Sequence, residues 1–74
     1  MTNQEKKDKV LKNLSNIVEI KIEDCEVYNE YSVIVLYEQG SDIIVCNDSK
    51  EVNNLYNYLT ERFIDYQSEN NQQL

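Results

Sequence analysis

Two apolar segments on either side of Gly40, the only glycine in the chain, constrain the fold most strongly. They span residues 31–38 and 42–47, and their length and β-branched content are typical of strands. Gly40 is followed by serine, an order that fits a two-residue type II′ turn and would place Tyr37 opposite Ile44 in a hairpin. Both faces of this hairpin would be apolar, so each needs a cover. The side chains concerned are Val33, Val35, Tyr37, Ile44 and Cys46 on one face, and Ile34, Leu36, Ile43 and Val45 on the other.

A helix after residue 48 is predicted to cover one of these faces. Asp48 and Glu51 fit a capping box, in which Asp48 caps the helix and Glu51 reaches back to the preceding backbone. The apolar residues that follow recur at helical spacing and form one narrow stripe, typical of a helix packed on a sheet. The stripe consists of Val52, Leu55, Tyr56, Leu59, Phe63 and Tyr66.

The N-terminal part of the chain predicts a shorter helix and a first strand. Apolar residues at helical spacing predict a helix over residues 5–16. Alternation of apolar and charged residues over 18–22 predicts a half-buried strand. If this strand ran straight to a turn at Asn29 and Glu30, Asp24 would lie on a buried face. A bulge or a longer loop would relieve that conflict.

Together these elements predict a single α+β domain over residues 1–74, in the order helix, three-stranded antiparallel meander, C-terminal amphipathic helix packed on the sheet. Residues 67–74 are expected to form a frayed polar tail. Because the second helix covers only one hairpin face, either the N-terminal helix or a second subunit must cover the other. A homodimer is therefore one of two predicted arrangements.

The charge of the chain is unevenly distributed around a net value of −7. Residues 1–18 carry four lysines against two carboxylates, whereas residues 19–74 carry three basic residues against twelve acidic ones. This acidity disfavours direct nucleic-acid binding and favours a basic protein partner or a purely solubilising role. The N-terminus lacks the apolar stretch of a signal peptide, and no apolar run is long enough to span a membrane. We therefore expect a cytoplasmic protein with reduced cysteines and no membrane partner.

The residue types that catalysis and metal binding need are scarce. The chain has no histidine and two cysteines, and this set cannot form a conventional structural zinc site. One glycine cannot build a phosphate-binding loop, and the acidic residues lack the spacing of a calcium loop. Cys46 and Cys25 are expected to act as small apolar side chains. We therefore expect no enzymatic activity, no catalytic residue, no metal and no cofactor.

Two acidic surfaces are the candidate partner-binding sites. The first, which we call the loop cluster, consists of Glu23, Asp24, Glu26 and Glu30. The second, which we call the acidic ridge, has i, i+4, i+8 spacing on the outer face of the second helix and consists of Glu61, Asp65 and Glu69, with Tyr58 on the same face. Tyrosine among carboxylates is typical of protein-binding surfaces. The alternatives are an ordinary polar loop and an ordinary solvated helix face.

The order of elements and the acidity resemble a known family. The segment that carries the likeness, residues 33–52, reads VIVLYEQGSDIIVCNDSKEV. It resembles the hairpin-then-helix core of small acidic phage anti-CRISPR proteins, which block Cas9 by mimicking DNA. The resemblance implies a partner in the bacterial host cell with a basic, nucleic-acid-binding groove, such as Cas9, in which carboxylates replace phosphates. An immunity or antitoxin protein that neutralises a basic nuclease, and a small dimeric regulatory module, are the other function classes open to this chain.

Overall fold

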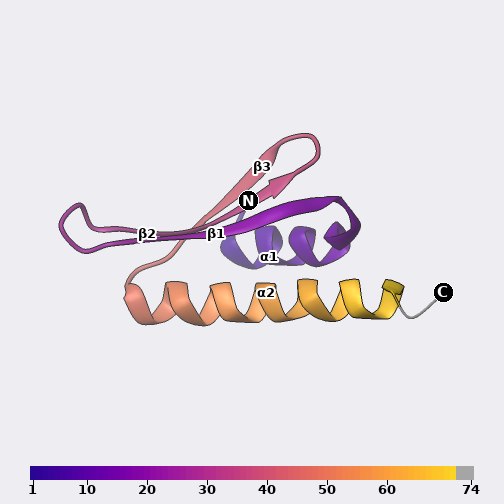
Figure 1. Ribbon diagram of the computed structural model, residues 1–74. Coiled ribbons are helices and arrows are strands. Elements are labelled where there is room, and N and C mark those ends of the chain that lie inside the picture. Colours follow the sequence, from indigo (N-terminus) through magenta and orange to yellow (C-terminus); the bar gives the residue numbers. More distant parts are fainter. Residues whose placement is uncertain (72–74) are drawn as a thin grey trace.

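The computed structural model describes residues 1–71 (Figure 1). Its order of helix, three antiparallel strands and helix confirms the predicted α+β class. The elements are α1 (Asn3–Lys12), the short 3₁₀ helix η1 (Leu14–Asn16), β1 (Ile17–Cys25), β2 (Glu30–Tyr37), β3 (Ser41–Val45) and α2 (Ser49–Asn71). The strands form one sheet in the order β1-β2-β3, so β1 and β3 are its two edges.

The register of the β2–β3 hairpin differs from the predicted one. Val33 lies opposite Ile44, whereas the sequence predicts Tyr37 there. The connection is longer than two residues, and Gly40 is its last residue, with a φ of 103° that favours glycine. The Tyr37 N–H donates to the Gly40 carbonyl at 3.0 Å and closes the loop. The register shift is four residues, an even number, so each side chain keeps its predicted face.

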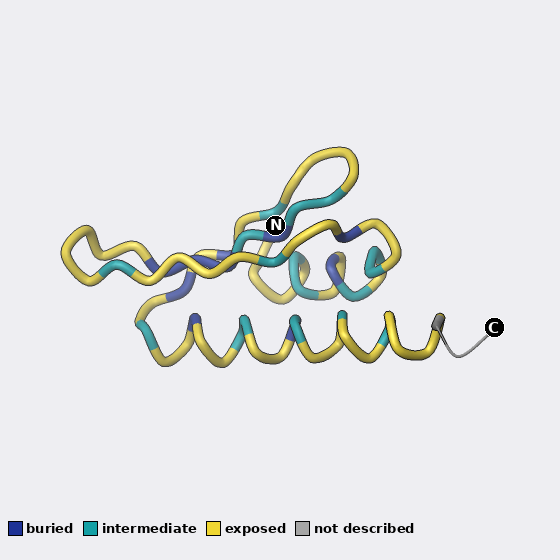
Figure 2. The backbone as a smooth tube through the Cα atoms, viewed as in Figure 1, coloured by how far each residue is buried: buried dark blue, intermediate teal, exposed yellow. Residues whose placement is uncertain are grey.

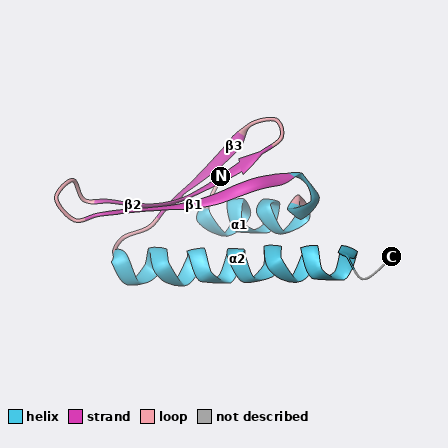
Figure 3. Ribbon diagram, in the orientation of Figure 1, coloured by secondary structure: helices cyan, strands magenta, loops and turns pink. Residues whose placement is uncertain are grey.

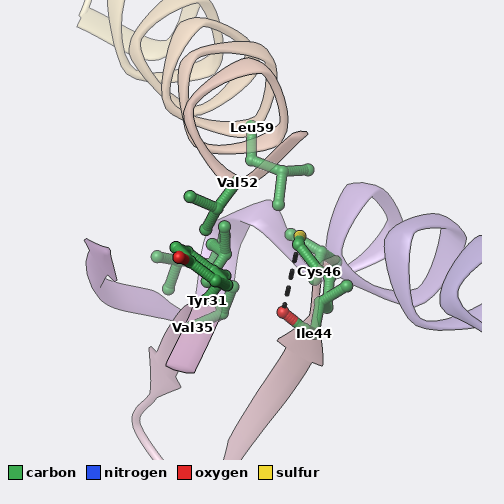
Figure 4. Close-up of a cluster of buried hydrophobic side chains, with 9 residues drawn as sticks. Tyr31, Val35, Ile44, Cys46, Val52 and Leu59 are labelled. Atoms are coloured by element: carbon green, nitrogen blue, oxygen red, sulfur yellow. Dashed lines mark hydrogen bonds between the residues drawn. The ribbon is translucent and has the colours of Figure 1, made fainter. Parts of the chain in front are cut away.

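The core lies between one face of the sheet and both helices (Figure 2). Figure 4 shows the α2 side chains pointing toward those of the strands. Their burial confirms the centre of the predicted stripe on α2 and the predicted inner face of the hairpin. The largest fully buried side chains are Val10 from α1, Val33 and Val35 from β2, Ile44 from β3, and Val52 and Leu59 from α2.

Within residues 1–71 neither helix covers the second face of the hairpin. The prediction that the N-terminal helix could do so is wrong, because α1 lies on the same side of the sheet as α2 (Figure 3). There its Val10 joins the common core. On the uncovered face Ile43 and Val45 are 48% and 60% exposed, and Ile34 and Leu36 are half-buried. The helices share one face because α1 is too short and polar to bury a face alone, and it fills the space beside α2.

α1 follows the outer edge of β3. The Lys6 ammonium donates to the Ile43 carbonyl at 2.8 Å, and the Asn3 amide donates to the Val45 carbonyl at 2.8 Å. Side chains three residues apart lie on one helix face, and they reach alternate carbonyls on the strand. Unpaired backbone groups on an edge strand are a template for pairing with another chain. The side chains of α1 therefore protect this edge.

Asp42 joins α1 to the β2–β3 hairpin. The Lys9 ammonium lies 3.2 Å from the Asp42 carboxylate, and the Tyr37 hydroxyl donates to the same carboxylate at 2.8 Å. Burial of the Tyr37 ring, followed by this hydrogen bond, raises the pKa of its phenol. The carboxylate is largely buried yet has both a cation and a hydroxyl as partners, which offsets its loss of water.

A β-bulge changes the alternation at the start of β1. Ile17 lies opposite Tyr37 and Glu19 lies opposite Leu36, so the strand carries one extra residue between them. The predicted alternation from Val18 is therefore wrong at its first position. Ile17 is buried in the core, and Val18 is exposed.

α2 begins at the predicted cap and extends further than the sequence predicts. The Glu51 N–H donates to the Asp48 carboxylate at 2.8 Å, and the Glu51 carboxylate accepts the Asn47 N–H at 2.9 Å. The helix includes residues 67–71, which the sequence assigns to a frayed polar tail. Residues 72–74 of that tail lie outside the described residues.

We expect Leu59→Ala to lower the free energy of unfolding by about 2–5 kcal/mol, because truncating a fully buried leucine leaves a cavity. Urea denaturation followed by circular dichroism measures the change. Ile64→Ala on the same helix is the matched control, since Ile64 is exposed. Equal effects of the two substitutions would contradict the packing of α2.

Candidate functional site

The loop cluster lies at the end of the β1–β2 hairpin, which projects beyond the start of α2 (Figure 1). Residues 26–29 form the turn, and the Asn29 N–H donates to the Glu26 carbonyl at 3.2 Å. Asn29 has a φ of 54°, a left-handed conformation that asparagine tolerates. Val27 and Tyr28 at the tip are 86% and 73% exposed. The four acidic residues of the cluster are exposed as well.

Asp24 has a structural role within the loop cluster. The strand runs straight to Cys25, without the predicted bulge or longer loop in this region, and Asp24 lies opposite Tyr31. The conflict of an inward carboxylate is resolved by hydrogen bonds: the Ser49 hydroxyl donates to it at 2.6 Å, and the Asn53 amide approaches it at 3.5 Å. Asp24 therefore fastens the hairpin to the first turns of α2.

The start of α2 adds carboxylates near the loop cluster. Burial of the Tyr31 ring raises the pKa of its phenol, and the negative charges of Glu26, Asp24 and Asp48 raise it further. Asp48 contributes from the cap of α2, a position for which the sequence predicts a structural role only. Its contribution to this acidic end was missed because only the fold brings the cap beside the hairpin.

The negative charge of the loop cluster is not balanced by ion pairs. The sequence has no lysine or arginine between Lys21 and Lys50. The three ion pairs found within residues 1–71 involve Asp42, Glu61 and Asp65, and none involves the loop cluster. Three of its carboxylates, on Glu23, Glu26 and Glu30, therefore face solvent without a cation.

The acidic ridge lies on the second half of α2, toward the opposite end of the molecule (Figure 1). The structure therefore does not bring the two predicted surfaces together. Arg62 lies 3.8 Å from Glu61 and 3.6 Å from Asp65, so part of the ridge is compensated. Glu69 is exposed. The ridge is thus the weaker of the two negative surfaces.

Tyr58 contacts cations and is only partly accessible. The Lys7 ammonium lies 4.8 Å from the centre of its ring, and the Arg62 guanidinium lies 5.6 Å from it. Cations over an aromatic face are attracted to its negative quadrupole. Tyr58 thereby connects α1 to α2. The residue predicted to bind a partner thus also has a structural role.

The Cys, Asp and Glu side chains of residues 1–71 do not converge on a metal-binding arrangement. No group of three potential ligands is placed to hold a metal ion there. Both cysteines are free thiols, and burial, followed by the charges of Glu51 and Asp48, raises the pKa of the Cys46 thiol. A raised pKa disfavours the nucleophilic thiolate. In the described part of the chain, no helix is long and apolar enough to cross a membrane.

Two grooves flank α1. One, of about 490 Å³, lies between the end of α1 and the β2–β3 connection, and Lys9 and Tyr37 line it. The other, of about 380 Å³, lies between α1 and α2, and Lys7 and Tyr58 line it. Lys9 in the first groove and Lys7 in the second hold α1 against Asp42 and Tyr58, respectively.

We expect the Tyr31 phenol to ionise above the ordinary tyrosine pKa of 10.0. Because folding raises this pKa, the neutral phenol contributes stability that is complete below pH 10.0 and is lost as the pH rises through the raised value. Glu26→Gln should lower the pKa of Tyr31, since it removes a nearby negative charge. An NMR titration of Tyr31 measures it, with Glu61→Gln as a control of equal charge change. Equal pKa values in the two variants would show that Glu26 does not act on Tyr31.

Comparison with protein-family models finds no match for this chain, and comparison with curated proteins and with solved structures finds none either.

Proposed function

We propose that this protein is an acidic inhibitor that binds a basic, nucleic-acid-binding groove of a partner protein, as an anti-CRISPR-type phage protein does. The observation that carries the proposal is the unbalanced charge of the loop cluster at a projecting hairpin tip. Exposed carboxylates attract arginine and lysine side chains that otherwise contact phosphates, and the hydrogen bonds they accept are charge-assisted. A projecting hairpin can enter a groove that a flat surface cannot.

Apolar side chains at the tip of the β1–β2 hairpin favour a specific binding site, as opposed to a general attraction between opposite charges. Val27 and Tyr28 are exposed between the carboxylates of Glu26 and Glu30. Protein interfaces commonly have an apolar or aromatic centre within a polar rim. In this proposal Tyr28 and Val27 pack against the floor of the groove, and the surrounding carboxylates pair with its basic walls.

The contacts that three lysines of α1 make within the protein also support the proposal. Lys6, Lys7 and Lys9 contact the β3 edge, Tyr58 and Asp42, respectively. The basic N-terminal segment therefore does not form a free patch for nucleic acid. The surface that a partner meets is more acidic than the overall composition indicates.

The test is inhibition of DNA binding by Cas9 loaded with guide RNA. We expect the protein to compete with target DNA and to bind more weakly as salt rises from about 50 to about 200 mM, because salt screens charge attraction. The variant Glu23→Gln/Glu26→Gln/Glu30→Gln should weaken binding by about tenfold or more, since three exposed charge pairs are lost. Fluorescence anisotropy of labelled DNA measures both effects.

The matched control is Glu61→Gln/Asp65→Asn/Glu69→Gln on the acidic ridge, which changes the net charge equally. Equal losses in the two variants would show that net charge alone drives binding and would contradict a specific role for the tip. Binding that does not respond to salt would contradict the electrostatic mechanism. Inhibition of a basic nuclease in place of Cas9 would assign the protein to the immunity class.

A further inference from the structure

The two edges of the sheet differ in how they are protected. On the β3 edge, Lys6 and Asn3 of α1 bind the outward carbonyls. On the β1 edge, the hydrogen bonds found within residues 1–71 include none from another element to the backbone of Ile20, Ile22 or Asp24. β1 is nine residues long and contains no proline. It is therefore a long strand with an open edge.

The hydrogen-bond pattern shows which groups point outward from β1. Residues of an antiparallel strand bond alternately to the neighbour on either side. The Tyr31 carbonyl accepts the Cys46 N–H at 2.7 Å, so the odd-numbered residues of β2 bond to β3. The even-numbered residues of β2 therefore bond to β1, where Lys21 lies opposite Ile34. The backbone groups of the even-numbered β1 residues thus face away from the sheet.

We propose that β1 pairs in antiparallel orientation with β1 of a second copy of this chain and so joins two sheets into one of six strands. Ile22 lies opposite Ile22 of the second copy at the two-fold axis. In this register Lys21 lies opposite Glu23 of the second copy, and the same pair occurs again across the axis. The outward groups of Ile20 bond to those of Asp24 of the second copy. This interface goes beyond the proposed function and does not depend on it.

The charges of the side chains favour pairing centred on Ile22 over pairing centred on Lys21. Centring on Lys21 would place the two Lys21 ammonium groups opposite each other and Glu19 opposite Glu23, and like charges in these positions are destabilising. Centring on Ile20 would pair Glu19 with Lys21, but it would also bring the bulge at Val18 into the new ladder. A bulge disrupts strand pairing. Centring on Ile22 uses the regular part of the strand and matches opposite charges.

Partly exposed apolar side chains lie where this pairing would cover them. Ile22 is on the inner face of β1 yet is 37% exposed, because no strand lies beside it. In the paired arrangement Ile22 packs beside its copy. Burying the two Ile22 side chains removes apolar surface from water on both copies.

The first experiment is sedimentation velocity of the full chain from about 1 μM to about 1 mM, a range that covers weak and moderate affinities. We expect a monomer–dimer equilibrium. Ile22→Pro should abolish the dimer, because the Ile22 N–H faces outward and its loss leaves the β1–β2 ladder intact. Circular dichroism checks that the variant folds. A monomer throughout this range in the unaltered chain would overturn the proposal.

The second experiment tests the register by charge exchange. Lys21→Glu should weaken the dimer about tenfold, because two cross-strand attractions become repulsions. The double variant Lys21→Glu/Glu23→Lys should restore the affinity, since it reverses both members of each pair. The control for the double variant is Lys21→Glu/Glu38→Lys, which makes the same net charge change but places the new lysine on the exposed β2–β3 connection and should not restore the affinity.

Failure of the double variant to restore the affinity would overturn the register. A dimer that persists in Ile22→Pro but is lost in Ile43→Ser would place the interface on the uncovered sheet face and overturn the proposal. Because these measurements use no partner protein, they are independent of the Cas9 assay. The interface can therefore fail without affecting the proposed function, and the reverse is also true.

Discussion

The structure depends on one hydrophobic core between a single face of the sheet and the two helices, a core made within the described residues of nine buried side chains. α2 supplies Val52 and Leu59 to it, while α1 supplies only Val10. A chain of this length has little apolar area to bury, so both helices are needed on the same face. The cost is an opposite sheet face that keeps Ile43 and Val45 partly exposed.

Charged side chains determine the contacts and the surface outside the core. Three of the four lysines of α1 bind the edge of β3, the ring of Tyr58 and the carboxylate of Asp42, so the basic segment is held against the rest of the chain. Among the carboxylates without an ion pair in the described part of the chain, those of the loop cluster lie near Asp48 at the start of α2. The attraction within the chain and the negative outer surface therefore have a common origin in the uneven distribution of charge along the sequence.

Periodicity predicted the element order and the inner face of the hairpin, because apolar spacing reports burial directly. It did not predict details that depend on a single residue. The loop length at Gly40 sets the β2–β3 register, and the bulge at Val18 decides which end residue of β1 is buried. The Thr2–Glu5 capping box could have been read from its spacing and would have placed the start of α1 correctly. The inward position of Asp24 was recognised, but its partners on α2 are contacts between distant residues that no local pattern encodes.

The way α1 is attached has a consequence for assembly. Of the nine buried core side chains α1 supplies only Val10, with Leu11 packed against the core, and its hydrogen bonds to β3 come from polar side chains. We therefore expect α1 to open at a lower free energy than α2. Opening would uncover the β3 carbonyls and give the sheet a second free edge. A sheet with one open edge pairs once and closes as a dimer, whereas a sheet with two can add copies at both sides and grow as a filament. In the proposed β1–β1 pairing, the short lysine-rich helix would thus limit the number of chains that can join.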